Sequence, residues 1–311
     1  MLILGAGPIG VAFAAAFAGS GVTLCDPDPA RRAEVPARLS DARAAMASVG
    51  RNRTGPAPTV LPDAPPDTIA RATLILECGP ERAETKRAIL SALLPIAASD
   101  AVIATASSAI AMSRILPDAA DQARCLVAHP VNPPSVLRLI ELVPAPGTLP
   151  ATMDRAAALF TAAGFRPVRL GRETEGFVLN RLQGAVLREA YRLVGEGVIG
   201  PADLDLVMTE GLGPRWALSG PFETADLNTP GGIAAHAARM GPAYARMGAE
   251  RGEPGLPWPD VLVAKVSAAR RAILPLDALP QRAAWRARAV AQIVALRDRL
   301  LAEAPAAKDD P

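Results

Sequence analysis

Short apolar runs recur through the first half of the chain and alternate with helical or proline-rich segments. Short runs rich in Val, Ile and Leu are typical of strands buried on both faces of a sheet. Strands that alternate with helices predict an α/β fold with a Rossmann-type, doubly wound and mainly parallel sheet. We expect these strands at 2–4, 22–26, 73–77, 101–105, 125–129, 139–143 and 166–170.

The pattern changes to helical spacing from Phe177 onward. One stripe of apolar positions there comprises Leu179, Leu182, Val186, Ala190, Leu193 and Val194. Such a stripe predicts an amphipathic helix whose apolar face needs burial. A long amphipathic helix is expected over 281–304, and the tail 305–311 is expected to be frayed. The change of period predicts two domains, one with the sheet over 1–174 and one all-helical over 175–311.

Charge and cysteine content narrow the class of protein. The net charge is +2, and acids and bases are spread along the 311 residues. This distribution lacks the basic patch that is typical of proteins that bind nucleic acid or anionic membranes. Three separated cysteines, Cys25, Cys78 and Cys125, favour reduced thiols packed in a core and a cytoplasmic protein. Residues 1–25 are uncharged, but five glycines interrupt them and they have no basic segment. A buried strand–turn–helix therefore fits them better than a signal peptide or membrane anchor.

A glycine pattern directly follows the first expected strand. Gly5, Gly7 and Gly10 form G-x-G-x-x-G in "LILGAGPIG". Gly5 would make the tight turn, Gly7 would let the backbone approach a pyrophosphate, and Gly10 would let the next helix pack closely on the sheet. That helix, opening at Pro8 and Ile9, would present its amino end to the phosphates. The pattern predicts a dinucleotide-binding site.

An acid at the end of the second expected strand extends this pattern. Asp26 follows Gly5 by 21 positions, where a carboxylate accepts hydrogen bonds from the adenosine ribose. The same carboxylate would repel the additional phosphate of NADP, so NAD is the expected cofactor, although Arg31 and Arg32 lie close by. The alternative is a solvated acid in the turn before Pro27.

Polar residues also occur at other expected strand ends, where ligands bind in open α/β sheets. Glu77, Ser107 and His129 fall at or just after such ends. Glu141 lies inside the apolar run "LIELV", and a carboxylate buried there needs a partner. His129 is the best candidate, because a glutamate that accepts from one ring nitrogen fixes the tautomer and raises the basicity of the other. The alternatives are a Glu141 that faces solvent and a His129 satisfied by the backbone.

Two motifs carry a resemblance to a known family. They are "AHPVNPP" followed by "LIELVP", and "EGFVLNRLQGAVLREAYRLVGEGVIGPADLDLVMTEGLG" over 175–213. Both resemble the L-gulonate 3-dehydrogenase (lambda-crystallin) branch of the 3-hydroxyacyl-CoA dehydrogenase family. The resemblance extends from Gly5 to about Asn228 and more loosely to the end of the chain. It implies an NAD-dependent dehydrogenase whose helical second domain also forms a homodimer.

The resemblance implies a catalytic set as well. His129 matches the family's base, Glu141 its orienting acid and Asn180, in "GFVLNR", its asparagine. The family's serine matches Ser107 in "TASSAI", with Ser108 as a close rival. Serine and asparagine are neutral hydrogen-bonding groups that would hold the substrate oxygen as it becomes a carbonyl. Otherwise Asn180 would be a helix N-cap and Ser107 a turn residue.

Further contacts follow from the same resemblance. Glu77 and Arg82, in "ECGPER", are implied to contact the nicotinamide. Arg215 matches an arginine of the gulonate branch, where a guanidinium would hold a substrate carboxylate in two parallel hydrogen bonds. The alternative is a surface arginine beside Trp216. Residues 40–70 are shorter than in relatives and rich in proline, which argues against a CoA thioester, since the acyl-CoA enzymes use a helical pair here to hold CoA.

Together these patterns predict an NAD-dependent oxidoreductase that oxidises the 3-hydroxyl of a small 3-hydroxy acid, with His129 as general base. L-gulonate is the single substrate that the resemblance favours. A 3-hydroxyacyl-CoA or carnitine 3-dehydrogenase is the alternative, and a crystallin-like nucleotide-binding protein without turnover is a second one. No metal, nucleic acid or membrane partner is expected.

Overall fold

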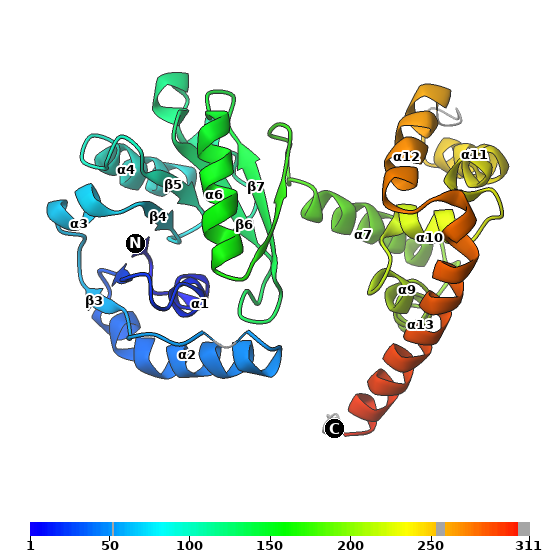
Figure 1. Ribbon diagram of the computed structural model, residues 1–311, viewed down its shortest axis with the longest axis horizontal. Coiled ribbons are helices and arrows are strands. Elements are labelled where there is room, and N and C mark those ends of the chain that lie inside the picture. Colours follow the sequence, from blue (N-terminus) through cyan, green and yellow to red (C-terminus); the bar gives the residue numbers. More distant parts are fainter. Residues whose placement is uncertain (52, 253–258, 304–311) are drawn as a thin grey trace. The chain divides into compact units, whose positions relative to one another are not determined.

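The computed structural model describes residues 1–51, 53–252 and 259–303, which divide into two compact units (Figure 1). The first unit, Met1–Arg188, contains the sheet, and the second begins at Glu189 and is helical. The helix α7 (Leu179–Gly195) contributes to both units. The expected domain limits, 1–174 and 175–311, remain a prediction.

Strands and helices alternate along the first unit, as expected from the sequence. Its strands are β1 (Leu2–Leu4), β2 (Thr23–Cys25), β3 (Thr59–Leu61), β4 (Leu74–Glu77), β5 (Val102–Thr105), β6 (Cys125–Pro130), β7 (Leu139–Pro144) and β8 (Arg166–Arg169). Its helices are α1 (Pro8–Ala16), α2 (Pro29–Ser48), α3 (Pro66–Arg71), α4 (Ala83–Leu93), α5 (Met112–Ile115), the 3-10 helix η1 (Ala119–Gln122) and α6 (Pro150–Ala162).

The strands form one 8-stranded sheet in the order β3-β2-β1-β4-β5-β6-β7-β8. All neighbouring pairs are parallel except β6 and β7, which are antiparallel. The prediction of a doubly wound, mainly parallel sheet is therefore confirmed.

The strand β3 was not expected, because its three residues lie within the proline-rich segment 55–67. It is an edge strand, and prolines at its two ends leave the ladder to β2 intact.

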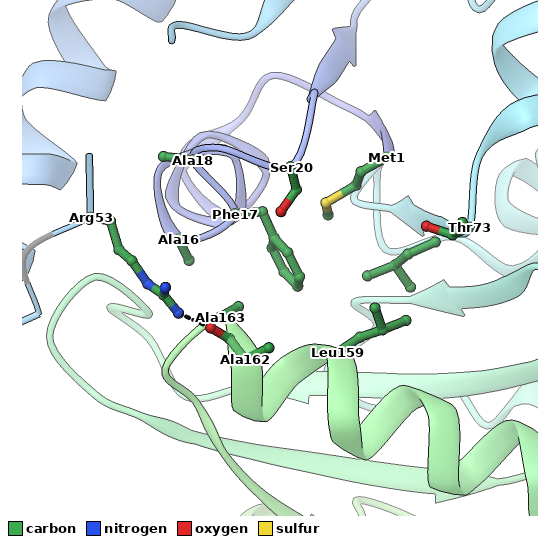
Figure 2. Close-up of a pocket in the computed structure, with 11 residues that line it drawn as sticks. Met1, Ala16, Phe17, Ala18, Ser20, Arg53, Thr73, Leu159, Ala162 and Ala163 are labelled. Carbon is green, nitrogen blue, oxygen red and sulfur yellow. Dashed lines mark hydrogen bonds between the residues drawn. The ribbon is translucent and has the colours of Figure 1, made fainter. Parts of the chain in front are cut away.

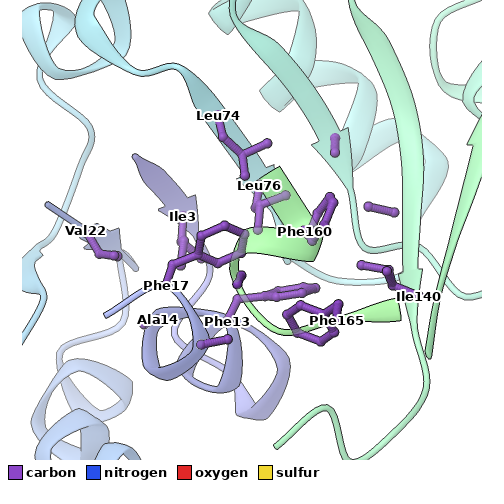
Figure 3. Packing of buried hydrophobic residues seen from close by; sticks show 14 of the residues in the cluster. Ile3, Phe13, Ala14, Phe17, Val22, Leu74, Leu76, Ile140, Phe160 and Phe165 are labelled. Carbon is purple, nitrogen blue, oxygen red and sulfur yellow. The ribbon is translucent and has the colours of Figure 1, made fainter. Parts of the chain in front are cut away.

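Alternation along the strands creates one hydrophobic cluster on each face of the sheet. On the face covered by α1, α2 and α6, the ring of Phe160 lies between the rings of Phe13, Phe17 and Phe165, with centroids 5.7 to 6.0 Å away (Figure 3). The other face is covered by α3, α4 and α5 and includes the side chain of Phe177. The sheet therefore lies between two packed hydrophobic layers.

The second unit is helical, as predicted. Its elements after α7 are α8 (Pro201–Leu206), the π-helical turn η2 (Val207–Leu212), α9 (Gly213–Trp216), α10 (Pro221–Leu227), α11 (Gly232–Glu250), α12 (Asp260–Ile273), the 3-10 helix η3 (Leu276–Ala278) and α13 (Leu279–Ala302). The helix α13 corresponds to the one expected over 281–304, whereas the tail 305–311 lies outside the described residues. Among the described residues, no helix combines the length and apolarity needed to cross a membrane.

A buried carboxylate organises this second unit. Asp226 on α10 is 0% exposed. It accepts hydrogen bonds from Arg271 on α12 and from the backbone N–H of Ile233 at 2.8 Å. Arg270 adds an ion pair to Asp226 at 3.5 Å. A carboxylate removed from water needs such partners, and these three connect α10, α11 and α12.

Replacing Phe160 by Ala is expected to lower the free energy of unfolding of the first unit by about 3–5 kcal/mol, because it leaves a cavity between three rings. Urea titration followed by circular dichroism measures this loss. The control is Phe222→Ala, since Phe222 is 58% exposed. Equal effects of the two substitutions would contradict the packing described for Phe160.

Candidate active site

The carboxyl ends of β1, β4, β5 and β6 lie side by side, because these strands are parallel neighbours in the sheet. The glycine-rich loop follows β1, and His129 is the penultimate residue of β6. Ser107 follows β5 by two residues, and Glu77 ends β4. Residues far apart in the sequence are thus brought to the edge where such sheets bind ligands.

The glycine-rich loop is too tightly packed to accept side chains at two of its glycines. A Cβ atom added to Gly10 would lie 1.9 Å from the carbonyl oxygen of Gly5. Gly5 has a φ of +109°, and its own Cβ would lie 2.7 Å from the carbonyl oxygen of Cys78. The helix α1 begins directly after Gly7, and no side chain caps it. Its first N–H groups are therefore available to a phosphate.

Asp26 supports this loop from the end of β2. Its side chain is buried; Oδ2 accepts a 2.8 Å hydrogen bond from the N–H of Ala6, and Oδ1 accepts a 3.0 Å bond from the N–H of Asp28. Each carboxylate oxygen has a second lone pair, which leaves capacity for the hydroxyls of a ribose. The tight glycine loop, the uncapped helix and this carboxylate together fit a dinucleotide.

Two arginines lie beside the same loop. Nη1 of Arg32 donates to the carbonyl oxygens of Asp26 at 2.7 Å and Pro27 at 2.8 Å. Nη1 of Arg31 lies 3.5 Å from the position that a Cβ would occupy on Gly7. Arg32 therefore holds the turn after β2, whereas Arg31 lies over the loop itself.

His129 and Glu141 stand directly opposite each other in the antiparallel ladder of β6 and β7. Nδ1 of His129 lies 2.8 Å from Oε2 of Glu141. The residues are 5% and 2% exposed, respectively. Neither alternative considered from the sequence, a solvent-facing glutamate or a histidine held only by the backbone, describes this arrangement. An ionised Glu141 accepts from Nδ1–H and leaves the Nε2 lone pair of His129 free.

The second carboxylate oxygen of Glu141 holds the start of α7. Oε1 accepts hydrogen bonds of 3.0 Å from the N–H groups of Val178 and Leu179. Burial alone would raise the pKa of Glu141, but the hydrogen bonds from His129, Leu179 and Val178 outweigh burial and lower the pKa below its usual range. Glu141 is therefore ionised at neutral pH, as a tautomer-fixing partner must be.

Glu77 lies in the interior. It is 0% exposed; its Oε2 accepts bonds from Nζ of Lys86 at 2.9 Å and Oγ1 of Thr105 at 2.6 Å. Its Oε1 accepts a 2.6 Å bond from the N–H of Gly79. Both oxygens are thus already bonded to the protein, and the expected contact of Glu77 with a nicotinamide remains a prediction.

Glu81, which the sequence analysis did not single out, occupies the more accessible position. Its Oε1 accepts from Oγ of Ser107 at 2.6 Å and from the N–H groups of Ser108 and Ala109 at 2.9 and 3.1 Å. Oε2 lies 3.4 Å from Nζ of Lys86. Burial would raise the pKa of Glu81, but these hydrogen bonds and the ammonium group lower it. An acid just before a helix, with a lysine one and a half turns later, is the signal that would have identified it.

The structure distinguishes the two serines and brings Asn180 to them. Ser107 is 0% exposed, and its hydroxyl donates to Glu81 while accepting a 2.8 Å bond from the N–H of Ile110. Ser108 is exposed, and its carbonyl oxygen accepts a 2.7 Å bond from Nδ2 of Asn180. Asn180 therefore bonds Ser108 rather than capping its own helix. The hydroxyl of Ser107 is thus already bonded to Glu81, whereas Ser108 is an exposed residue.

The two arginines that were expected to contact ligands are both at least partly exposed. Arg82 is exposed and is the N-cap residue of α4, without a side-chain cap hydrogen bond. Arg215 belongs to α9 in the second unit and is partly exposed; its Nε donates a 3.0 Å hydrogen bond to the carbonyl oxygen of Gly211. In neither case do the surrounding residues identify a ligand for the guanidinium group.

Of two cavities in the first unit, one adjoins the candidate site and the other does not. One of about 340 Å³ lies between α1, α2 and the loop after His129, with Pro8, Arg38, Asp41 and Asn132 in its lining. A smaller cavity, of about 170 Å³, lies among Met1, Phe17, Thr73 and Leu159, at the amino ends of β1 and β4, and Arg53 at its rim donates to the carbonyl oxygen of Ala162 (Figure 2). Only the larger one adjoins the candidate site.

A group of metal-ligating side chains is not found among the residues that the structure describes.

The loop that follows His129 is held by the guanidinium group of Arg51. Nη1 of Arg51, which is 6% exposed, donates to the carbonyl oxygens of Pro134 at 2.8 Å and Ser135 at 3.3 Å. Arg51, which follows the end of α2, thus anchors this proline-containing loop.

Acidification is expected to weaken the fold through Glu141. Because its pKa is lowered in the folded state, Glu141 stabilises the fold above the unfolded pKa of about 4.3, and this contribution is lost as the pH falls through the folded pKa. Glu141→Gln should therefore be less stable than the wild type at neutral pH, with a difference that shrinks below about pH 4. Urea titrations at several pH values measure this. Exposed Glu84 supplies the control, Glu84→Gln; a pH-independent difference for Glu141→Gln would refute the prediction.

Residues 1–174 match the NAD-binding domain of 3-hydroxyacyl-CoA dehydrogenase, and residues 176–270 match the C-terminal domain of the same enzyme. The chain is 42% identical to a lambda-crystallin homologue of Bos taurus over 75% of this chain and 73% of that protein. It is 50% identical to lambda-crystallin of Oryctolagus cuniculus over 50% of this chain, a match that spans about half, 49%, of that protein. L-carnitine dehydrogenase of Streptomyces griseus is 34% identical over 77% of this chain and 73% of its own.

Solved structures agree with these relatives. A 5-formyl-3-hydroxy-2-methylpyridine 4-carboxylic acid 5-dehydrogenase, described as an NAD+-dependent dismutase, has a TM-score of 0.70 and 26% identity. The match covers 87% of this chain and 96% of that one. The two proteins therefore share the fold described above. The chain belongs to the 3-hydroxyacyl-CoA dehydrogenase family of NAD-binding oxidoreductases.

Proposed function

We propose that the protein oxidises the 3-hydroxyl of a small 3-hydroxy acid to the ketone, with NAD as the oxidant and His129 as the general base. The observation that carries this proposal is the 2.8 Å contact between Nδ1 of His129 and the buried carboxylate of Glu141. Oxidation of an alcohol requires the loss of a hydride and of the hydroxyl proton. Bound NAD would supply the hydride acceptor, and the proton needs a base of this kind.

Glu141 prepares His129 for that role. By accepting from Nδ1–H, its carboxylate keeps the tautomer in which Nε2 has no proton. The imidazolium formed when Nε2 takes the hydroxyl proton is then stabilised by the adjacent negative charge. Because three hydrogen bonds hold Glu141, the ring would keep its orientation through the proton transfer.

Neutral donors would position the substrate oxygen. We assign this role to Asn180 together with one of the two serines. The hydroxyl of Ser107 already donates to Glu81, whereas Ser108 is exposed and its carbonyl holds Asn180. The exposure of Ser108 supports it as the direct donor, and Ser107, which the family resemblance matches, is the rival.

The cofactor contacts follow from the loop geometry. We assign the pyrophosphate to the loop from Gly5 to Gly10, including Pro8 and Ile9, and the ribose hydroxyls to Asp26. For the nicotinamide end, Glu77 and Arg82 were inferred from the family resemblance. The exposure and bonds of Glu81 support it as the acid nearest that end of the site, with Glu77 acting through Lys86.

The substrate is proposed to be a small acid, with L-gulonate as the first candidate. In the described part of residues 40–70, α2 is followed by an extended stretch, the edge strand β3 and the start of α3. This described part of the segment lacks the pair of long helices that would hold a CoA moiety. Its structure therefore disfavours a 3-hydroxyacyl-CoA as the substrate. Carnitine remains the other alternative, since a relative is named for that activity. Arg215 is proposed to hold the carboxylate of the substrate.

We propose a cytoplasmic homodimer for the assembled protein. The helix α7 has no buried residue in the single chain, and Leu182 on its apolar stripe is 58% exposed. An apolar stripe that the single chain leaves incompletely buried is suited to association with another copy. The rival function is that of a crystallin-like protein that binds the nucleotide without turnover; the buried His129–Glu141 pair favours the enzyme, because a structural role does not need it.

His129→Gln tests the proposed chemistry. Turnover should fall about 10²- to 10⁴-fold, because general-base catalysis is lost, while NADH binding should change little. The assay follows NADH absorbance with L-gulonate, carnitine and other 3-hydroxy acids as substrates, and NADH binding is measured separately by fluorescence. His236→Gln is the matched control, since Nδ1 of His236 lies 3.1 Å from the hydroxyl of Thr229 and not beside a buried carboxylate. Normal turnover of the His129 variant would refute the assignment.

Asp26→Asn tests the expected preference for NAD. The amide can still accept from the N–H of Ala6 but carries no charge, so the affinity for NADH should fall about 10-fold. The affinity for NADPH should fall less or rise, because the repulsion of its additional phosphate is removed. Calorimetric titration with both nucleotides measures the ratio. An unchanged ratio would remove Asp26 from cofactor selection.

A further inference from the structure

Phe177 has a backbone conformation that bulky residues seldom adopt. Its φ is +53°, and it is the only non-glycine residue with a positive φ in the described part of the chain. Gly176, directly before it, has a φ of +72°. Glycine adopts this region freely, whereas a residue with a Cβ does so at a cost in free energy. Strained backbone of this kind occurs where the surroundings require it, often at functional sites.

The two left-handed residues determine where α7 begins. The N–H of Phe177 donates a 3.1 Å hydrogen bond to the carbonyl oxygen of Thr174, which closes a turn. Directly after this turn, the N–H groups of Val178 and Leu179 both point at Oε1 of Glu141, at 3.0 Å. The backbone conformation at Phe177 is therefore what directs two N–H donors onto the carboxylate that holds His129.

The side chain of Phe177 contacts the other member of the pair. The ring is 0% exposed, and its centroid lies 5.5 Å from that of the His129 imidazole at an angle of 52°. This places the ring on the same face of the sheet as His129 and Glu141, within the cluster formed with α3, α4 and α5. Phe177 thus touches the histidine with its ring and positions the donors to the glutamate with its backbone.

A glycine would make the turn at position 177 without strain, so the presence of a phenylalanine there needs a separate reason. We propose that Phe177 is a positioning residue for the His129–Glu141 pair, whose ring keeps the imidazole in line with Glu141. This inference builds on the proposed role of His129 as base. The competing explanation is that the ring only fills the core, in which case any equally buried phenylalanine would behave in the same way.

The composition of the chain permits a direct measurement of the imidazole. His129 and His236 are its only histidines, so selective ¹⁵N-histidine labelling gives two sets of ring signals, and His236 serves as an internal reference. The chemical shifts of the two ring nitrogens report the tautomer of His129 without any assay of activity. NADH affinity and turnover are measured on the same samples.

Two substitutions separate the ring from the backbone. Phe177→Leu removes the ring but leaves a branched residue at positive φ, and Phe177→Gly removes the ring and relieves the strain. The matched control is Phe160→Leu, since Phe160 is also 0% exposed but lies in the cluster on the other face of the sheet. Because the glycine variant relieves strain, it remains informative if the leucine variant does not fold.

Both Phe177 variants should show a mixture of His129 tautomers in place of the single Nδ1–H form. Their turnover should fall about 10- to 100-fold, as expected for a small misplacement of a catalytic group, with NADH affinity within about threefold of the wild type. Phe160→Leu should leave the His129 signals unchanged. Wild-type His129 signals in Phe177→Gly, or an equal change in Phe160→Leu, would overturn the inference. A single fixed tautomer in a wild-type protein without turnover would instead refute the proposed function and leave the positioning role of Phe177 standing.

Discussion

One carboxylate connects the parts of the molecule on which the proposed chemistry depends. Glu141 is buried between β6 and the start of α7, and it accepts hydrogen bonds from a side chain on the first and two backbone groups on the second. Removing a carboxylate from water costs several kcal/mol, and the cost is offset only when its lone pairs are satisfied. Because three donors satisfy this one, Glu141 stays charged, and its charge fixes both the histidine and the helix.

Much of this arrangement could be predicted from the sequence, because it depends on local patterns. The apolar runs identified the buried strands, and the glycine spacing with Asp26 identified the loop of a dinucleotide site. The His129–Glu141 contact was inferred from the cost of burying a carboxylate in "LIELV". The antiparallel direction of β7 was beyond such reasoning, because an apolar strand has the same composition in either direction. β3 was missed because the prolines that flank it are those that usually mark a loop.

The sequence singled out Glu77, whereas the structure shows that Glu81 is the more accessible of the two acids. This difference shows a further limit of prediction from the sequence. Both acids lie in "ECGPER", and their types are identical. Glu77 is the last residue of β4, so alternation of side chains turns it inward, where Lys86 and Thr105 neutralise and bond it. Glu81 comes after the strand has ended and is free of that alternation. The distinction depends on where the strand stops, and strand ends are the feature that sequence patterns locate least well. A buried ion pair such as Glu77–Lys86 adds little net stability but holds the start of α4 in one position.

The proposed chemistry depends on the register of the ladder between β6 and β7, which residues 131–138 connect. His129 faces Glu141 only in the register that also pairs Val127 with Val143. Side chains alternate between the faces of a sheet, so a shift of a single residue would turn the glutamate to the opposite layer and present Ile140 or Leu142 to the imidazole. A change of length within either strand therefore separates the acid from the proposed base unless a bulge absorbs it, whereas a change of length in residues 131–138 leaves the register intact.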